Sequence, residues 1–248
     1  MKPTMKNLIL ISGAMLCALV LHERNAQAQQ TSPTSDQTPV TAIDILLEPD
    51  TTMIQHAEAV NARLLKVFPK GFSLDATHHP HITMVQRFVR TADLDQVYAA
   101  ADQVFANSKV TDLKLKAVKY YYIPDKSLGL SGIVVEPTPE LLRLEQQLIE
   151  AVAPFTVKTG TSAAFVTTPE NPVINPLLIE YVSVFVPKHS GEHYLPHVTT
   201  GLAPKEYLDK MLAEPFETFT FSPVGVSVYH LGHYGTAAKK LKVVDVKR

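Results

Sequence analysis

Two short strings of residues that could perform acid–base chemistry occur far apart in this chain. The strings are Pro80-His81-Ile82-Thr83 and Pro196-His197-Val198-Thr199. β-Branched residues favour strands, and strand side chains alternate between two faces, so His81 and Thr83 are expected on one face of a strand. His197 and Thr199 are expected to share a face of a second strand for the same reason. Each string therefore predicts one imidazole and one hydroxyl held side by side.

Two histidines that face one cleft would suit general acid–base catalysis. An imidazole titrates near neutral pH, so one ring can accept a proton while the other donates one. Cleavage of a phosphodiester needs both steps, because a water or hydroxyl loses a proton and the leaving oxygen gains one. The threonine hydroxyls and nearby backbone N–H groups could hold the non-bridging phosphate oxygens, since donors aimed at developing charge stabilise the transition state. The scheme predicts a phosphodiesterase that needs no metal or other cofactor.

The elements that must position these residues alternate similarly in both halves of the chain. In the first half we expect strands at 41–48, 79–89, 112–123 and 128–136, and helices at 51–68, 91–105 and 138–152. In the second half we expect strands at 177–186, 194–202, 216–231 and 241–246, and a short helix from 204. Residues 160–176 show no regular spacing of apolar residues, and we expect either a loop over the site or a linker between the lobes. Strands joined by short turns indicate an α+β fold of two pseudo-symmetric lobes of antiparallel sheet with flanking helices, and the active-site cleft lies between them.

The two strings, one in each half, resemble the paired motifs of the 2H phosphoesterase superfamily. Among bacterial members, the chain is similar to the RNA 2′,3′-cyclic phosphodiesterase / RNA 2′,5′-ligase-like proteins. The resemblance implies that His81 and His197 form the acid–base pair and that Thr83 and Thr199 bind the phosphate. It also implies metal-independent opening of a 2′,3′-cyclic phosphate, or hydrolysis of a related phosphodiester. The expected partner is a small phosphodiester or cyclic nucleotide, or a short RNA end.

Arg87 departs from the family pattern, because close relatives often carry a small residue at this place. By a period of two it shares a strand face with His81 and Thr83, where its guanidinium could clamp a phosphate with two hydrogen bonds. A solvated charge at the end of the strand explains it equally well. We therefore include Arg87 among the candidate substrate-binding residues.

Two other functions are compatible with the same residues. His78 and His79 precede His81 closely enough to suggest a zinc hydrolase, since imidazole is a common zinc ligand. Alternation, however, turns His78 away from the other two, and the nearby acidic residues lack ligand spacing. A non-catalytic protein that binds a nucleotide or sugar phosphate in the same cleft is the main alternative to an enzyme.

The start of the chain has the pattern of a bacterial secretory signal peptide. Lys2 and Lys6 precede an apolar run at 8–21, and Ala26-Gln27-Ala28 is a small-x-small cleavage site. We expect a signal peptide at 1–28, a disordered leader at 29–40 rich in proline, serine and threonine, and a bilobal domain at 41–248. The expected location is periplasmic or secreted, with no stable membrane insertion after cleavage, because the apolar run is short for a membrane span.

Composition narrows the possible partners and chemistry. The chain has 23 basic and 24 acidic residues and a formal net charge of −1, with no cluster of lysine or arginine. Binding of long nucleic acid relies on many basic side chains that neutralise phosphates, so we expect no such partner. The single cysteine, Cys17, would leave with the signal peptide, which removes disulfides and thiol catalysis from consideration.

Overall fold

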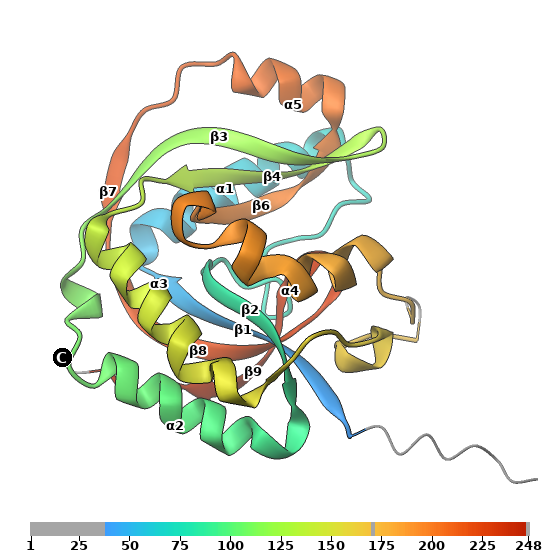
Figure 1. Ribbon diagram of the computed structural model, residues 1–248. Coiled ribbons are helices and arrows are strands. Elements are labelled where there is room, and N and C mark those ends of the chain that lie inside the picture. Colours follow the sequence, from blue (N-terminus) through green and yellow to red (C-terminus); the bar gives the residue numbers. More distant parts are fainter. Residues whose placement is uncertain (1–37, 170–171, 247–248) are drawn as a thin grey trace, which may run out of the picture. The chain divides into compact units, whose positions relative to one another are not determined.

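The computed structural model describes residues 38–169 and 172–246 (Figure 1). The predicted signal peptide at 1–28 and the predicted leader, as far as residue 37, lie outside the described residues. Among the helices that are described, none is both long and apolar enough to cross a membrane.

Two antiparallel sheets form the framework of the described part of the chain. The first has the strand order β5-β2-β1-β8-β9, formed by Thr156–Val157, Ile82–Arg90, Val40–Pro49, Pro223–Leu231 and Ala237–Val243. The second has the order β6-β4-β3-β7, formed by His197–Pro204, Leu128–Val135, Leu115–Asp125 and Phe219–Phe221. Because neighbouring strands run antiparallel in both sheets, their ladders can be joined by short connections.

The two sheets repeat one arrangement of strands. Apart from the two-residue β5, the order β2-β1-β8-β9 corresponds to β6-β4-β3-β7, so the motif strands β2 and β6 occupy equivalent places. A helix follows each motif strand, α2 (Leu94–Phe105) after β2 and α5 (Lys205–Leu212) after β6. The prediction of an α+β fold with two pseudo-symmetric antiparallel lobes is confirmed.

The helices between the strands join the two lobes. α1 (Thr51–Val67), which connects β1 to β2, packs on the motif strand β6 of the other sheet. α3 (Pro139–Val152), which follows β4, packs on the motif strand β2 and lies beside α2 (Figure 1). One continuous apolar core therefore includes buried residues of both sheets, such as Ile82 and Val198. These two residues follow the motif histidines and face the core, as alternation predicts.

One predicted strand is a helix, and the prediction at 177–186 is wrong. α4 spans Pro176–His189 and begins where Asn175 caps it by accepting a hydrogen bond from the Leu177 N–H at 3.0 Å. Pro176 occupies the first turn, where its missing N–H costs nothing. A short apolar run of this kind does not reveal its period, so a buried strand and a helix look alike in sequence. The capping residues Asn175 and Pro176 were the usable signal.

Candidate active site

The two motif histidines are held by the same local contact. His81 directly precedes β2, and its Nδ1 lies 2.6 Å from the backbone carbonyl oxygen of His79. His197 begins β6, and its Nδ1 lies 2.8 Å from the carbonyl oxygen of Leu195. In each string the proline fixes the backbone between that carbonyl and the ring. A carbonyl can only accept, so Nδ1 carries the hydrogen in both rings and Nε2 is left to exchange a proton.

All four residues of the paired motifs line one cavity of about 200 Å³. His81 and Thr83 reach it from the first sheet, and His197 and Thr199 reach it from the second. The structure thus brings together two strings that the sequence keeps far apart. Part of the wall is apolar and comes from Leu130, Leu177, Leu178 and Leu202.

A β-bulge follows the threonine in both motif strands. In β2 the pairing with β1 passes from Thr83 to Val85, so Met84 has no partner in the ladder. In β6 the pairing with β4 passes from Thr199 to Gly201, which leaves out Thr200. A bulge of one residue exchanges the two faces of the strand beyond it. Beyond the bulges, Gln86 and Leu202 therefore line the cavity at equivalent positions.

Arg87 is not brought to the cavity, and the prediction that it shares a face with His81 and Thr83 is wrong. The bulge at Met84 gives that face to Gln86 instead. The Arg87 guanidinium Nη2 donates a hydrogen bond to Oγ1 of Thr156, the first residue of β5, at 3.0 Å. Strict alternation failed here because one extra residue in a strand reverses every later side chain.

Asp44 is a residue of this site that the sequence interpretation missed. Its side chain is completely buried on β1, and its Oδ2 accepts hydrogen bonds from Thr83 Oγ1 at 2.6 Å and Gln86 Nε2 at 2.9 Å. The same oxygen lies 3.4 Å from His81 Nε2. A buried carboxylate is unfavourable unless it is paired, so the contacts with His81 and its neighbours hold it in place. An acidic residue in the middle of the apolar run TAIDILL was the signal in the sequence.

The equivalent position of the other lobe has no charge. Asp44 faces Gln86 across the β1–β2 ladder, and Leu130 faces Leu202 across the β4–β6 ladder. The two histidines therefore have the same backbone contact but different surroundings. His81 has a carboxylate beside it, whereas His197 has leucines at the equivalent place and the edge of the Tyr121 ring at 4.8 Å between centroids.

This asymmetry shifts the pKa values of the two histidines in opposite directions. Burial alone would lower the pKa of His81, but the hydrogen bond and negative charge of Asp44 raise it above its usual value. Burial, with a smaller contribution from the positive charge of His81, lowers the pKa of His197 to about 4, although the hydrogen bond to the Leu195 carbonyl and the charge of Asp44 act in the opposite direction. Asp44 therefore favours the charged form of His81, whereas burial favours the neutral form of His197.

Tyr194 connects the two motif strands. It lies three residues before His197, is buried, and donates its hydroxyl hydrogen to the Thr83 carbonyl oxygen at 2.6 Å. The bond crosses from the segment that leads into β6 to the strand β2 of the other sheet. It therefore fixes the distance between the two motifs as well as contributing to stability.

We expect Tyr194→Phe to lower the free energy of unfolding by about 1–2 kcal/mol, because it leaves the Thr83 carbonyl without this donor. Urea unfolding measures the change. Tyr98→Phe is the control, since Tyr98 lies on α2, outside the cavity. Equal stability of Tyr194→Phe and the unmodified protein would show that the bond is not formed in solution.

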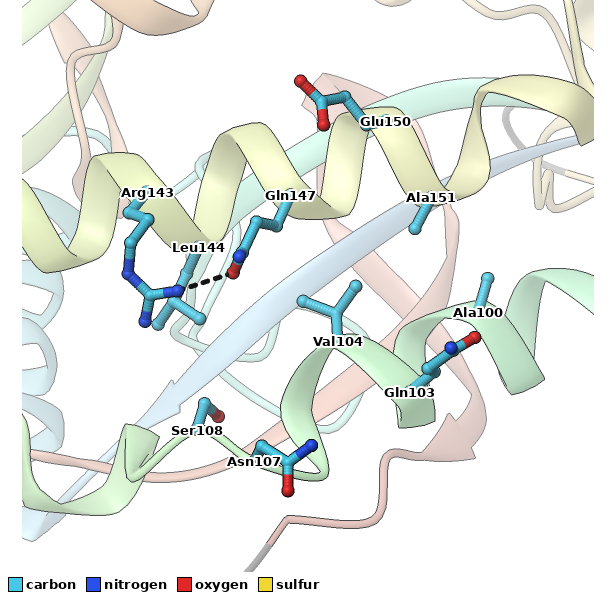
Figure 2. Close-up of a pocket in the computed structure, with 10 residues that line it drawn as sticks. All are labelled: Ala100, Gln103, Val104, Asn107, Ser108, Arg143, Leu144, Gln147, Glu150 and Ala151. Atoms are coloured by element: carbon cyan, nitrogen blue, oxygen red, sulfur yellow. Dashed lines mark hydrogen bonds between the residues drawn. The ribbon is translucent and has the colours of Figure 1, made fainter.

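A larger pocket lies elsewhere and has different chemistry. It is a groove of about 550 Å³ between α2 and α3 (Figure 2). Figure 2 shows the polar side chains of this groove. Among them, Arg143 Nη1 donates a hydrogen bond to Gln147 Oε1 at 2.8 Å. Its lining contains no histidine, and Arg143 is also paired with Glu140 on the same helix. Chemistry rather than size therefore identifies the smaller cavity as the candidate active site.

The site contains no ready set of metal ligands. Within 38–169 and 172–246, no group of three or more histidine, cysteine or acidic side chains is placed to hold a metal ion. His78 forms a contact with Asp75 at 3.2 Å, and the ring of His79 stacks on Tyr229, so neither ring converges with His81 on a common point.

Comparison with known proteins finds similarity in structure and none in sequence. No protein-family model and no curated protein matches the chain. TT0787 of Thermus thermophilus matches with a TM-score of 0.49 and 13% identity over 82% of this chain and 97% of its own. E. coli LigT complexed with ATP matches with a TM-score of 0.41 and 12% identity over 84% of this chain and 99% of its own. Kluyveromyces marxianus Usb1 matches with a TM-score of 0.41 and 8% identity over 82% of this chain and 96% of its own.

All three TM-scores lie below 0.5 and all three identities below 25%, so no property of these proteins is carried over to this chain.

Proposed function

We propose that this protein is a metal-independent phosphodiesterase that opens 2′,3′-cyclic phosphates with one His/Thr pair from each lobe. One observation supports this above all others. His81, Thr83, His197 and Thr199 line a single cavity although they come from two different sheets. Two proton-exchanging rings and two hydroxyls around one space are the groups that transfer of a phosphoryl centre to water requires.

The opposite pKa shifts assign the two proton transfers. His197 is neutral and acts as the base, so its Nε2 takes a proton from water as the water oxygen bonds to phosphorus. The bond from phosphorus to the 2′ or 3′ oxygen breaks, and that oxygen takes the proton from Nε2 of charged His81. The product is a nucleoside monophosphate. Proton exchange with solvent then restores both rings.

The two threonines differ in what they offer to the phosphate. Thr83 Oγ1 donates to Asp44 at 2.6 Å, so its hydrogen must turn away from the carboxylate before it can bind a phosphate oxygen. No described residue accepts from the Thr199 hydroxyl, which therefore can donate directly. We assign Thr199 as the main hydroxyl donor to the phosphate, and Thr83 as the link between phosphate and Asp44.

The test is hydrolysis of a 2′,3′-cyclic nucleotide by the purified protein in excess EDTA, followed by phosphorus NMR. We expect conversion to a nucleoside monophosphate at a rate that EDTA does not change. Activity that is lost with EDTA and restored by zinc would support the zinc hydrolase instead. Tight binding in calorimetry without any product would support the non-catalytic binding protein.

A further inference from the structure

A second chamber adjoins the candidate active site. It has a volume of about 270 Å³ and shares Thr83, Tyr181 and His197 with the first cavity. Its other walls are mostly aromatic and include Tyr121 and Phe185. The proposed catalytic groups therefore lie at the junction of two chambers, as they would if each chamber held one substituent of a phosphodiester.

The charge around the two chambers is unusual for a phosphate site. No lysine or arginine is among the described residues that line either chamber. Two carboxylates lie at hand, Asp125 in the lining of the first chamber and Asp44 in contact with His81. His189 and His193 line the second chamber, and burial lowers the pKa of His189. The described linings therefore hold no permanent positive charge, and His81 shares its charge with Asp44.

Apolar side chains are exposed around the same chambers. Leu177 is 66% exposed and Ile123 40% exposed in the lining of the first chamber, and Leu195 is 44% exposed in the lining of the second. Tyr234, 48% exposed, also lines the first chamber. Exposed apolar groups gathered at one place mark a surface that binds an apolar partner or ligand.

The helix α4 supplies much of this apolar wall. It contributes Leu177, Leu178 and Tyr181 to the first chamber and Phe185 to the second. Between α3 and β6 the chain passes through β5 and α4, whereas no helix or strand lies between α1 and β2. This segment therefore gives the cavity a wall that the symmetry of the two lobes does not explain.

On the basis of the proposed phosphodiesterase function, we infer that the substrate is a singly charged phosphodiester whose uncharged, largely apolar group lies against α4. An RNA end that carries several phosphates does not fit this lining. A second phosphate would lose part of its water beside Asp44 and Asp125 and would find no lysine or arginine in exchange among the described lining residues. The single phosphate of the reacting diester, by contrast, is matched by His81 and the two threonines.

Two substrates that differ only in charge test this inference. We compare adenosine 2′,3′-cyclic phosphate with the same compound phosphorylated at its 5′ oxygen. The unphosphorylated compound should have a kcat/KM at least about tenfold higher, because like charges brought together without a partner oppose binding. Calorimetry with His197→Ala, which should not consume either ligand, should show the same order of affinity.

Adding a positive charge to the wall should weaken the preference. Leu177→Lys should lower the ratio of kcat/KM for the unphosphorylated substrate to that for the 5′-phosphorylated substrate several-fold. Val224→Lys is the matched control, because Val224 is 57% exposed and lies outside both chambers, and it should change neither value.

The outcomes separate this inference from the proposed function. If both substrates are hydrolysed equally well, or the 5′-phosphorylated one is hydrolysed faster, the phosphodiesterase stands and the inference about charge is wrong. If neither is hydrolysed but the unphosphorylated compound binds more tightly, the proposed function is wrong and the charge preference stands. Failure of both compounds to bind would overturn both.

Discussion

Replacement of His197 by alanine is expected to lower kcat for a 2′,3′-cyclic nucleotide by about 10²–10⁴-fold, the usual contribution of one general acid–base group. The neutral ring of His197 is the proposed proton acceptor, and among the described histidines it alone lines both chambers. His81→Ala should cost a similar factor, because the leaving oxygen then lacks its proton donor. The two losses should not multiply, since residues that act as one unit are not additive.

The measurement is steady-state hydrolysis at neutral pH, with each variant checked for folding by urea unfolding. His56→Ala is the control, because His56 is exposed on α1 and stacks on Phe219, away from the cavity. It should retain full activity. A stably folded His197→Ala protein with activity near that of the unmodified protein would refute the assignment of this ring as the base.

Asp44→Asn is expected to have the next largest effect, which is a change in the pH dependence of kcat/KM. The active form needs neutral His197 and charged His81, so kcat/KM rises as pH passes the low pKa of His197 and falls as pH passes the raised pKa of His81. Asparagine keeps the size of the side chain and removes the charge that raises the pKa of His81. The fall in kcat/KM should therefore move to lower pH while the rise at acidic pH remains.

Stability should change in a corresponding way. The pKa of His81 is higher in the folded protein than in the unfolded chain, so its pairing with Asp44 stabilises the fold fully below the unfolded pKa. This contribution is lost as pH rises through the folded pKa. The difference in unfolding free energy between Asp44→Asn and the unmodified protein should thus be larger at pH 5.5 than at pH 8.5, values chosen to lie on either side of the ordinary pKa of about 6.5 for histidine.

Asp125→Asn is the matched control for this experiment. It removes a carboxylate from the lining of the same cavity, but Asp125 is exposed and forms no ion pair with His81. Its pH profile should stay close to that of the unmodified protein. If Asp44→Asn also leaves the profile unchanged, Asp44 only supports the strand and does not control the charge of His81.

The sequence by itself determined the elements that carry the chemistry. The strings around His81 and His197 predicted two motif strands, and the residues that follow them predicted helices that became α2 and α5. These features follow from local properties, namely β-branching, alternation and capping, which a single sequence displays. The repetition of one string in two halves also predicted two similar lobes, and the matching strand orders agree with it.

Tertiary structure decided which side chains meet. Because of the bulge at Met84, Gln86 and not Arg87 lines the cavity. The run at 177–186, predicted as a strand, lies in the helix α4, which forms part of the cavity wall. The pairing of β1 with β2 placed Asp44 beside His81, while the pairing of β4 with β6 placed Leu130 at the equivalent point. Strand register and long-range packing fix such contacts, and two nearly identical strings do not reveal them. The sequence alone therefore indicated two interchangeable histidines, and only the folded chain gave them the different surroundings from which their roles as acid and base are proposed.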